Sequence, residues 1–329
     1  YFQSKRLQLY ANKIKQLLDN GHAYYCFCTP ERLTRLREEQ QAQNLPQGYD
    51  KHCRDLSPET VQANLKAGKD SVIRLKVPQD TKIVFTDLVR GQLEFDSNLI
   101  DDQILIKSDG FPTYHFANVV DDHDMDISHV IRGEEWVTST PKHILLYQAF
   151  GWETPSFAHL PLILNPDRSK LSKRQGDVAV EDFLKAEFCE ETLINFLALL
   201  GWNPGSDREF FNLEELVSEF SLQKVSKSGA VFDREKLNWM NSQYHKKYLS
   251  EQRFLELVKP FANIDELKSW SSNVLDKVLL TLRNQIDKPE DIKELLSFFL
   301  GRPTVETLRG QECSDILKIE SNNKLFRFI

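Results

Sequence analysis

The chain has 329 residues, of which 40% are hydrophobic and 28% are charged, as is typical of a soluble globular protein of two or three domains. It has no run of about 18 apolar residues and no apolar segment at its start, so the sequence predicts neither a membrane span nor a signal peptide. The net charge of -7 excludes a chain that is basic throughout. It allows local basic surfaces, and lysine and arginine outnumber acidic residues in segments 165–176 and 222–248.

The first third of the chain combines two expected helices with a β-rich segment. Apolar residues at helical spacing predict a helix over residues 7–18 that stops before Gly21, and a charged helix is expected over 30–43. From residue 71 the apolar residues alternate with polar ones, and Gly91 marks a turn between two such runs. We therefore expect residues 71–110 to form a small β-rich unit inserted in a larger domain.

The middle of the chain predicts a strand, a helix and a second strand. Residues 130–131 are expected to be a short buried strand, and residues 160–164 a further apolar strand. Between them, a hydroxyl residue at 139 or 140 can cap a helix, Pro141 suits its first turn, and Gly151 can end it. A strand–helix–strand order of this kind favours a parallel sheet.

Beyond residue 176 the pattern is mainly helical. Two stripes of leucine and aromatic residues recur at intervals of three to four, over 183–200 and 267–282. Stripes of this kind are typical of a hydrophobic core, and we expect both to be buried.

The strongest local motif is SKLSKRQG at residues 169–176. Two lysines three apart, with a serine and a glycine, predict a flexible cationic loop. Lysine ammonium groups are point charges suited to phosphates, and charge stabilisation dominates phosphate chemistry. The loop is therefore a candidate triphosphate site.

Four segments in order resemble the glutamyl-tRNA synthetases, which are class I aminoacyl-tRNA synthetases. The string KLSKR at 170–174 resembles the second ATP signature of the class, and GFPTYHFANVVDDH at 110–123 resembles the glutamate-pocket segment. IRGEEW at 131–136, followed by STP, looks like the next stretch, and VFDREKLNWMN at 231–241 resembles the stem-contact region. The resemblance covers residues 1 to about 248, and it is of the bacterial or organellar type.

The resemblance implies an α/β fold, with a partial Rossmann-type catalytic domain, an inserted α+β acceptor-arm domain and an α-helical C-terminal region. Residues 1–24 and 111–164 would be the two parts of the catalytic domain, and 25–110 the insertion. Residues 165–249 would hold the KMSKS-type loop and the stem-contact region. Residues 250–329 would be a helical anticodon-binding region.

The implied activity is the ATP-dependent attachment of L-glutamate to tRNA(Glu) through a glutamyl-adenylate, with Mg²⁺ accompanying ATP. We expect a monomeric cytoplasmic ligase without membrane contact. One alternative is a glutaminyl-tRNA synthetase, which would normally continue into β-barrel domains where residues 264–300 here favour helix. Another is a tRNA-binding module without catalysis. A glutamyl-queuosine synthetase would lack the C-terminal helical region.

The resemblance assigns the substrate residues one by one. Arg132 would pair with the side-chain carboxylate of glutamate, because a guanidinium fork fits a carboxylate at two points. Tyr114 and Asn118 would complete this pocket. Lys170 and Lys173 would grip the ATP phosphates, with Lys173 acting on the departing pyrophosphate. The other ATP-binding positions would be Glu135, Trp136, Leu162, Ile163 and Ser172.

A metal site is expected only near the first three cysteines. Five cysteines are present, Cys26, Cys28, Cys53, Cys189 and Cys313, and so sparse and odd a set favours a reducing compartment. The first three resemble the zinc knuckle of some family members, with Asp55 in place of the usual histidine; His52 is another available ligand. The alternative is a set of reduced structural thiols. The group Asp121, Asp122, His123 and Asp126 is expected to orient the pocket and to bind no metal.

One family signature is not found. Class I synthetases carry a first ATP signature of His-x-Gly-His type at a helix N-terminus, and none of the eight histidines lies in such a string. The family places this signature before residue 1. We therefore expect the chain by itself to be inactive, and we expect residues 324–329 to be a truncated end.

Overall fold

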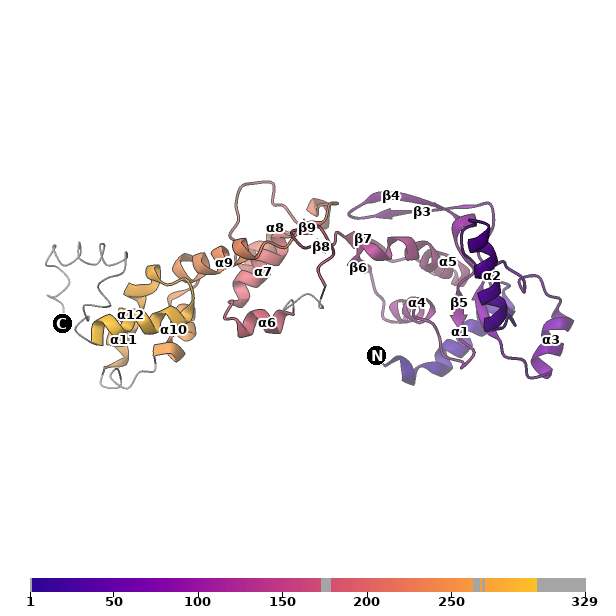
Figure 1. The fold of residues 1–329 in the computed structure, drawn as a ribbon, viewed down its shortest axis with the longest axis horizontal. Helices are drawn as coiled ribbons and strands as arrows, with labels where there is room; N and C mark the ends of the chain where they lie inside the picture. The colour runs from indigo at the N-terminus through magenta and orange to yellow at the C-terminus, as the bar shows by residue number, and fades with distance from the viewer. Residues whose placement is uncertain (1, 173–178, 263–266, 268–269, 301–329) are drawn as a thin grey trace. The chain divides into compact units, whose positions relative to one another are not determined.

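The computed structural model of the chain describes residues 2–172, 179–262, 267 and 270–300, without the side chains of 298–300 (Figure 1). Lys173 and Cys313 therefore lie outside the described residues. The chain divides into two compact units. The first holds residues 1–162, 201–205 and 220–230, and the second holds residues 163–200, 206–219 and 231–329.

The first unit contains five α-helices and seven strands among its described residues. In chain order they are α1 (Leu7–Asp19), β1 (Ala23–Cys26), α2 (Pro30–Ala42), α3 (Pro58–Lys66), β2 (Val72–Leu75), β3 (Lys82–Asp87), β4 (Gly91–Asp96), β5 (Ile104–Ile106), α4 (Tyr114–Asp124), β6 (His129–Gly133), α5 (Thr140–Phe150) and β7 (Ser156–Leu160). Short 3₁₀ helices are η1 (Gln3–Lys5), η2 (Ser97–Leu99), η3 (Glu134–Ser139) and η5 (Leu222–Lys224). The two helices expected near the N-terminus are confirmed within one residue at each end.

The strands of the first unit form two separate sheets. One is antiparallel, in the order β1-β2-β5. The other has the order β4-β3-β7-β6, in which β3 and β4 are antiparallel and β3, β7 and β6 are mutually parallel. The expected strand–helix–strand order is found as β6-α5-β7, but the second strand lies at 156–160 and not at the predicted 160–164, and residues 163–164 belong to another sheet. The expectation of one β-rich unit over 71–110 is wrong, because the β3–β4 hairpin joins β7.

The core of the first unit lies between these sheets and the helices α1, α4 and α5. Tyr10, Leu17, Phe116 and Leu146 contribute fully buried side chains to it. The burial of β6 differs from expectation: Ile131 is 50% exposed. β6 is the edge strand of its sheet and is only partly covered, and Ile131 is one of the residues that line the cavity described below.

The second unit is mainly helical. Its elements are α6 (Val180–Lys185), α7 (Glu190–Leu199), α8 (Leu213–Glu219), α9 (Arg234–Gln243), the π-helical turn η6 (Tyr244–Tyr248), α10 (Glu251–Val258), η7 (Lys259–Ala262), α11 (Ser272–Leu282), η9 (Arg283–Gln285), η10 (Pro289–Asp291) and α12 (Ile292–Leu300). The short strands β8 (Ile163–Leu164) and β9 (Ala230–Val231) pair with each other. In the described part of the chain, every helix is too short or too polar to span a bilayer.

The two predicted stripes are core only in part. Phe183, Phe188 and Phe196 are buried together, whereas Leu197 is 45% exposed. In the second stripe Leu282 is buried, as predicted, whereas Val274 is 48% exposed.

Candidate active site

The ends of three parallel strands bring Asp87, His159 and Arg132 together. Arg132 on β6 and His159 on β7 are direct register partners, and Asp87 ends β3 opposite Phe157 of β7. Register partners on neighbouring strands project from the same face of a sheet. The carboxyl ends of parallel strands are also where open α/β sheets bind ligands.

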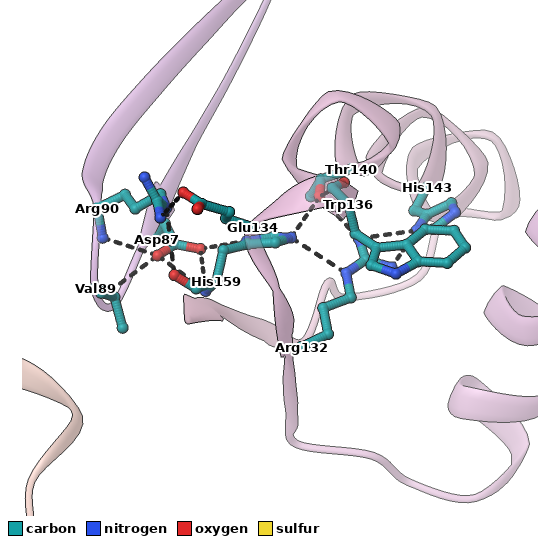
Figure 2. A network of polar contacts seen from close by, with 9 residues as sticks. All are labelled: Asp87, Val89, Arg90, Arg132, Glu134, Trp136, Thr140, His143 and His159. Carbon is teal, nitrogen blue, oxygen red and sulfur yellow. Dashed lines mark hydrogen bonds and ion pairs between the residues drawn. The ribbon is translucent and has the colours of Figure 1, made fainter. Parts of the chain in front are cut away.

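Arg132 donates hydrogen bonds to three side chains (Figure 2). Its Nε lies 3.2 Å from Nε2 of His159, its Nη2 lies 2.8 Å from Oγ1 of Thr140, and both terminal nitrogens lie 3.4 Å from Nδ1 of His143. Thr140 begins α5, but neither it nor Ser139 makes the expected side-chain cap. The Thr140 hydroxyl instead donates to the Trp136 carbonyl at 3.0 Å and accepts from Arg132.

Asp87 is buried and fully engaged behind His159. Its Oδ2 lies 2.6 Å from Nδ1 of His159, and its Oδ1 accepts from the amides of Val89 and Arg90 at 3.0 and 2.9 Å. Burial raises the pKa of Asp87, but the hydrogen bonds from His159 and these amides outweigh it, so the pKa lies below its ordinary value. The carboxylate is therefore ionised at neutral pH.

The histidines of this network are neutral. Burial lowers the pKa of His159 and outweighs the opposing effect of Asp87, and burial lowers the pKa of His143 to about 3. An ionised Asp87 requires a proton on Nδ1 of His159, which leaves Nε2 as the acceptor for Arg132. By the same logic His143 accepts from Arg132 at Nδ1 and donates from Nε2 to Nδ1 of His115, 2.9 Å away.

A cavity of about 420 Å³ opens beside Arg132. It is lined by Gln3, Tyr114, Asn118, Asp121, Asp122, Ile127, His129, Val130, Ile131 and Arg132. The three residues predicted to bind glutamate, Tyr114, Asn118 and Arg132, therefore share one cavity. Arg132 contributes the cation, and Tyr114 contributes a phenol that is half-exposed.

Two carboxyl groups of the cavity differ in role. Asp121 accepts hydrogen bonds from Arg6 at 2.8 Å and Tyr10 at 2.8 Å, so it anchors the N-terminal segment. Asp122 accepts from the Asn118 amide at 3.3 Å, and burial raises its pKa. Asn118 Oδ1 is buried and has no hydrogen-bond partner among the described residues. The Asn118 oxygen is thus an acceptor in the cavity wall.

The predicted ATP-binding residues fall in both units. Trp136 lies beside the cavity, with its ring 5.0 Å from that of Tyr114 and 5.5 Å from the Arg132 guanidinium. The Leu162 amide donates to Glu134 Oε1 at 3.2 Å, and Glu134 also pairs with Arg90. The neighbouring Glu135 is exposed.

The rest of the predicted ATP site belongs to the second unit. The Ile163 carbonyl accepts a hydrogen bond from the Leu171 amide at 2.9 Å, and Lys170 forms an isolated antiparallel β-bridge with Leu164. Ser172 is the last described residue of this loop, so Lys173 cannot be placed in the site.

Three cysteines form the one group of three or more potential metal ligands found in the described part of the chain. The sulfurs of Cys26, Cys28 and Cys53 lie within 4.8 Å of one another. A hydrogen bond with Cys53 lowers the pKa of Cys26 to about 4. Asp55 lies outside the group and pairs with Lys76 at 3.5 Å. The Tyr49 hydroxyl oxygen lies against this group, 3.3 Å from the Cys26 sulfur.

The sequence did not identify Asp87, Thr140, His143 or His159 as site residues. The spacing predicts Thr140 only as a possible helix cap, and His159 falls just before the strand expected over 160–164. A polar residue flanked by apolar strand residues, as His159 is by Ala158 and Leu160, was the available signal.

The chain is similar to known proteins over most of its length. The family model described as tRNA synthetases class I (E and Q), catalytic domain, matches residues 1–239. A glutamate–tRNA ligase of Clostridioides difficile is 52% identical over 317 residues, covering 95% of this chain and 64% of its own length. One of Alkaliphilus metalliredigens is 46% identical, covering 97% and 65%. The chain thus spans a little under two thirds of these relatives.

A solved structure is similar over nearly the whole chain. It is a glutamate tRNA ligase from Elizabethkingia meningosepticum in complex with its amino acid. The TM-score is 0.81 at 34% sequence identity, and the match covers 98% of this chain and 70% of that one.

Proposed function

This chain belongs to the class I tRNA synthetases for glutamate and glutamine, and from that premise we propose that the full-length protein attaches L-glutamate to tRNA(Glu). The α-carboxylate oxygen of glutamate attacks the α-phosphorus of ATP, and pyrophosphate leaves. The terminal ribose hydroxyl of the tRNA then attacks the carbonyl carbon of the adenylate, and AMP leaves. The protein positions the reactants and stabilises charge, without a covalent enzyme intermediate.

The observation that supports this proposal best is the setting of Arg132. Its guanidinium lies at a cavity of about 420 Å³, and it donates hydrogen bonds to a threonine and two neutral histidines. A cation in such a place favours the side-chain carboxylate of glutamate over the neutral amide of glutamine. This preference argues for glutamate within a family that serves both amino acids.

Tyr114, Asn118 and Trp136 would complete the amino-acid pocket. The Tyr114 hydroxyl can donate to a carboxylate, whereas the unpaired Asn118 oxygen can accept from an ammonium group. Trp136 lies against both Tyr114 and Arg132, so we propose that it borders the glutamate pocket as well as the adenosine.

Lys170 and Lys173 would bind the ATP phosphates, with Ser172 between them. Glu135, Leu162 and Ile163 would flank the adenosine. Mg²⁺ bound with ATP would neutralise phosphate charge. These roles rest on the matched signature at 170–174 and on the class of the family.

The test is replacement of Arg132 in the full-length protein. Arg132→Gln should raise the KM for glutamate by an amount equivalent to about 2–5 kcal/mol, because the carboxylate loses its partner. The assay is glutamate-dependent exchange of labelled pyrophosphate into ATP with tRNA present. An unchanged glutamate KM would refute the role of Arg132.

The same assay separates the alternatives. A glutaminyl-tRNA synthetase would exchange pyrophosphate with glutamine and not with glutamate. A tRNA-binding module without catalysis would give no exchange with either amino acid.

We also propose that the cysteine cluster binds zinc. Bonds of about 2.3 Å in a tetrahedral site separate the sulfurs by about 3.8 Å, and the Cys28 and Cys53 sulfurs lie 3.6 Å apart. The low pKa of Cys26 supplies a thiolate, which is the form that binds metal. Tyr49, whose hydroxyl is 3.3 Å from Cys26 and 3.7 Å from Cys28, would face the fourth position.

Metal analysis of the purified full-length protein tests this site. One zinc per chain is expected, and Cys28→Ser should remove it. Cys189→Ser is the matched control, because Cys189 is a buried free cysteine outside the cluster. A protein without zinc at saturating metal would instead support reduced structural thiols.

The remaining expectations complete the proposal. We propose a monomeric cytoplasmic enzyme that binds tRNA along the basic segments 165–176 and 222–248. We also propose that residues 1–24 and 111–164 form the catalytic domain and residues 25–110 an inserted acceptor-arm domain. Residues 165–249 would then hold the KMSKS-type loop and the stem-contact region, and residues 250–329 the anticodon-binding region.

A further inference from the structure

We propose that Asp87 and His159 position Arg132 so that its positive charge is kept for the substrate. The inference rests on the proposed role of Arg132 in binding the glutamate side chain. Asp87 and His159 act through Arg132 and do not themselves contact the substrate, so they are positioning residues.

Arg132 differs from most of the buried and half-buried arginines of the first unit. Arg6, Arg54 and Arg90 pair directly with the acidic side chains of Asp121, Asp102 and Glu134, whereas the buried Arg74 donates to the Asp102 backbone carbonyl. No ion pair of Arg132 is found among the described residues, although it is held at three points by His159, Thr140 and His143. Its direction is therefore fixed by neutral acceptors.

A directly bound carboxylate would defeat this purpose. It would satisfy the guanidinium fork and compete with the carboxylate of the substrate. Asp87 is instead one side chain removed, behind the imidazole of His159. Its effect is to choose which nitrogen of His159 carries the proton.

That choice decides whether His159 attracts or repels Arg132. With the proton on Nδ1, as an ionised Asp87 requires, Nε2 offers a lone pair to the Arg132 Nε–H at 3.2 Å. With the proton on Nε2, this N–H would face the Arg132 Nε–H and would donate instead to the Thr140 hydroxyl oxygen, 3.0 Å away, so Arg132 would lose His159 as an acceptor. The amides of Val89 and Arg90 hold Asp87 ionised by their hydrogen bonds.

The strand arrangement makes this set rigid. Arg132 and His159 are register partners in a parallel ladder, and Asp87 ends the next strand of the same sheet. Side chains on paired strands hold their spacing better than side chains on loops. The positioning therefore comes from the sheet and not from the ligand.

Two replacements of His159 separate the contacts. The His159→Asn amide can occupy the place of Nδ1 and donate to Asp87, but it cannot reach Arg132. The His159→Gln oxygen can occupy the place of Nε2 and accept from Arg132. We expect His159→Asn to raise the glutamate KM about tenfold or more and His159→Gln to restore most of it, because a hydrogen bond to a charged group is at stake. The KM for ATP should move less than about twofold in both variants.

Asp87→Asn is the second variant, in case a replacement of His159 fails to fold. The asparagine amide keeps the shape of the side chain and can donate to Nδ1, which forces the proton to Nε2. The glutamate KM should rise as in His159→Asn. Tyr24→Phe is the control, because it removes a buried hydrogen bond to Asp102, 2.7 Å long, in the other sheet of the same unit. It should lower the melting temperature and leave the glutamate KM unchanged.

Glutamate-dependent pyrophosphate exchange by the full-length protein, with tRNA present, gives the KM for glutamate and the KM for ATP of each variant. If Arg132→Gln leaves the glutamate KM unchanged, the proposed function of Arg132 fails. If Arg132→Gln raises it while His159→Asn and Asp87→Asn do not, only the positioning inference is overturned. Equal increases in the KM for glutamate and ATP, with no recovery in His159→Gln, would also overturn it, since they indicate general damage to the fold.

Discussion

Asp102 is expected to be a main determinant of the stability of the first unit. Its side chain is fully buried just before β5. It accepts from the Tyr24 hydroxyl at 2.7 Å, from Arg54 Nη1 at 2.9 Å and from the Val77 amide at 3.1 Å. One carboxylate therefore joins β1, the turn before α3 and the segment after β2.

Asp102→Asn keeps the volume of the side chain and removes its charge. The Arg54 side chain is only 10% exposed, and it would lose its acidic partner while keeping its bond to the Val77 carbonyl. Breaking a buried ion pair from one side costs about 3–5 kcal/mol. Because the amide oxygen can still accept from Val77 and Arg54 retains one partner, we expect a loss of about 3 kcal/mol in the free energy of unfolding.

Urea denaturation followed by circular dichroism measures this loss. The midpoint should fall while the slope is unchanged, since the surface exposed on unfolding is the same. Asp109→Asn is the control: Asp109 also pairs with a cation, Lys107, but both side chains are about half exposed, so the loss should be much smaller than in Asp102→Asn. A loss in Asp102→Asn no larger than that of the control would refute the reasoning.

Three further predictions concern charge. Lys173→Ala in the full-length protein should lower the kcat of adenylate formation more than it raises the KM for ATP, because Lys173 is expected to act on the departing pyrophosphate; rapid-quench kinetics would show a pure KM effect if this is wrong. The affinity for tRNA should fall steeply as salt rises, despite the net charge of -7, and a flat response in filter binding would contradict the role of the basic segments. His143 has a pKa of about 3 in the folded chain, so below the ordinary histidine pKa of about 6.5 the unfolded chain binds the extra proton and stability falls with falling pH. His143→Gln should make the unfolding free energy less dependent on pH between about 4 and 6.5, and an unchanged slope would argue against a neutral His143.

The parts of the fold that follow from local spacing could be predicted. Tyr10, Ile14 and Leu17 are buried along one side of α1, as their spacing indicated. The turn at Gly91, with φ of +82°, could also be predicted, because it depends only on residues of its own β3–β4 hairpin. The pairing of β3 with β7 could not be predicted, because an alternating pattern shows that a strand exists and not which strand it joins.

For the site too, contacts between residues close in sequence could be predicted, and contacts between distant residues could not. The resemblance over residues 110–136 placed Tyr114, Asn118 and Arg132 in one pocket, and they do line one cavity. The contact of Asp87 with His159 spans 72 positions and has no local signature. His159 was missed because the predicted strand began at 160, whereas β7 runs from 156 to 160 and is followed by Pro161, which has no amide hydrogen to continue a ladder.

The pairing of β6 with β7 has a consequence for changes in chain length. Because Arg132 and His159 face each other through strand register, deleting or inserting one residue within 129–133 or 156–160 would turn one of them to the opposite face of the sheet. The same change at 153–155, between the core residue Trp152 and β7, leaves the register intact and alters only the length of a connection. Length variation and fusion junctions in this region should therefore be tolerated between Trp152 and Ser156 and be incompatible with activity inside either strand.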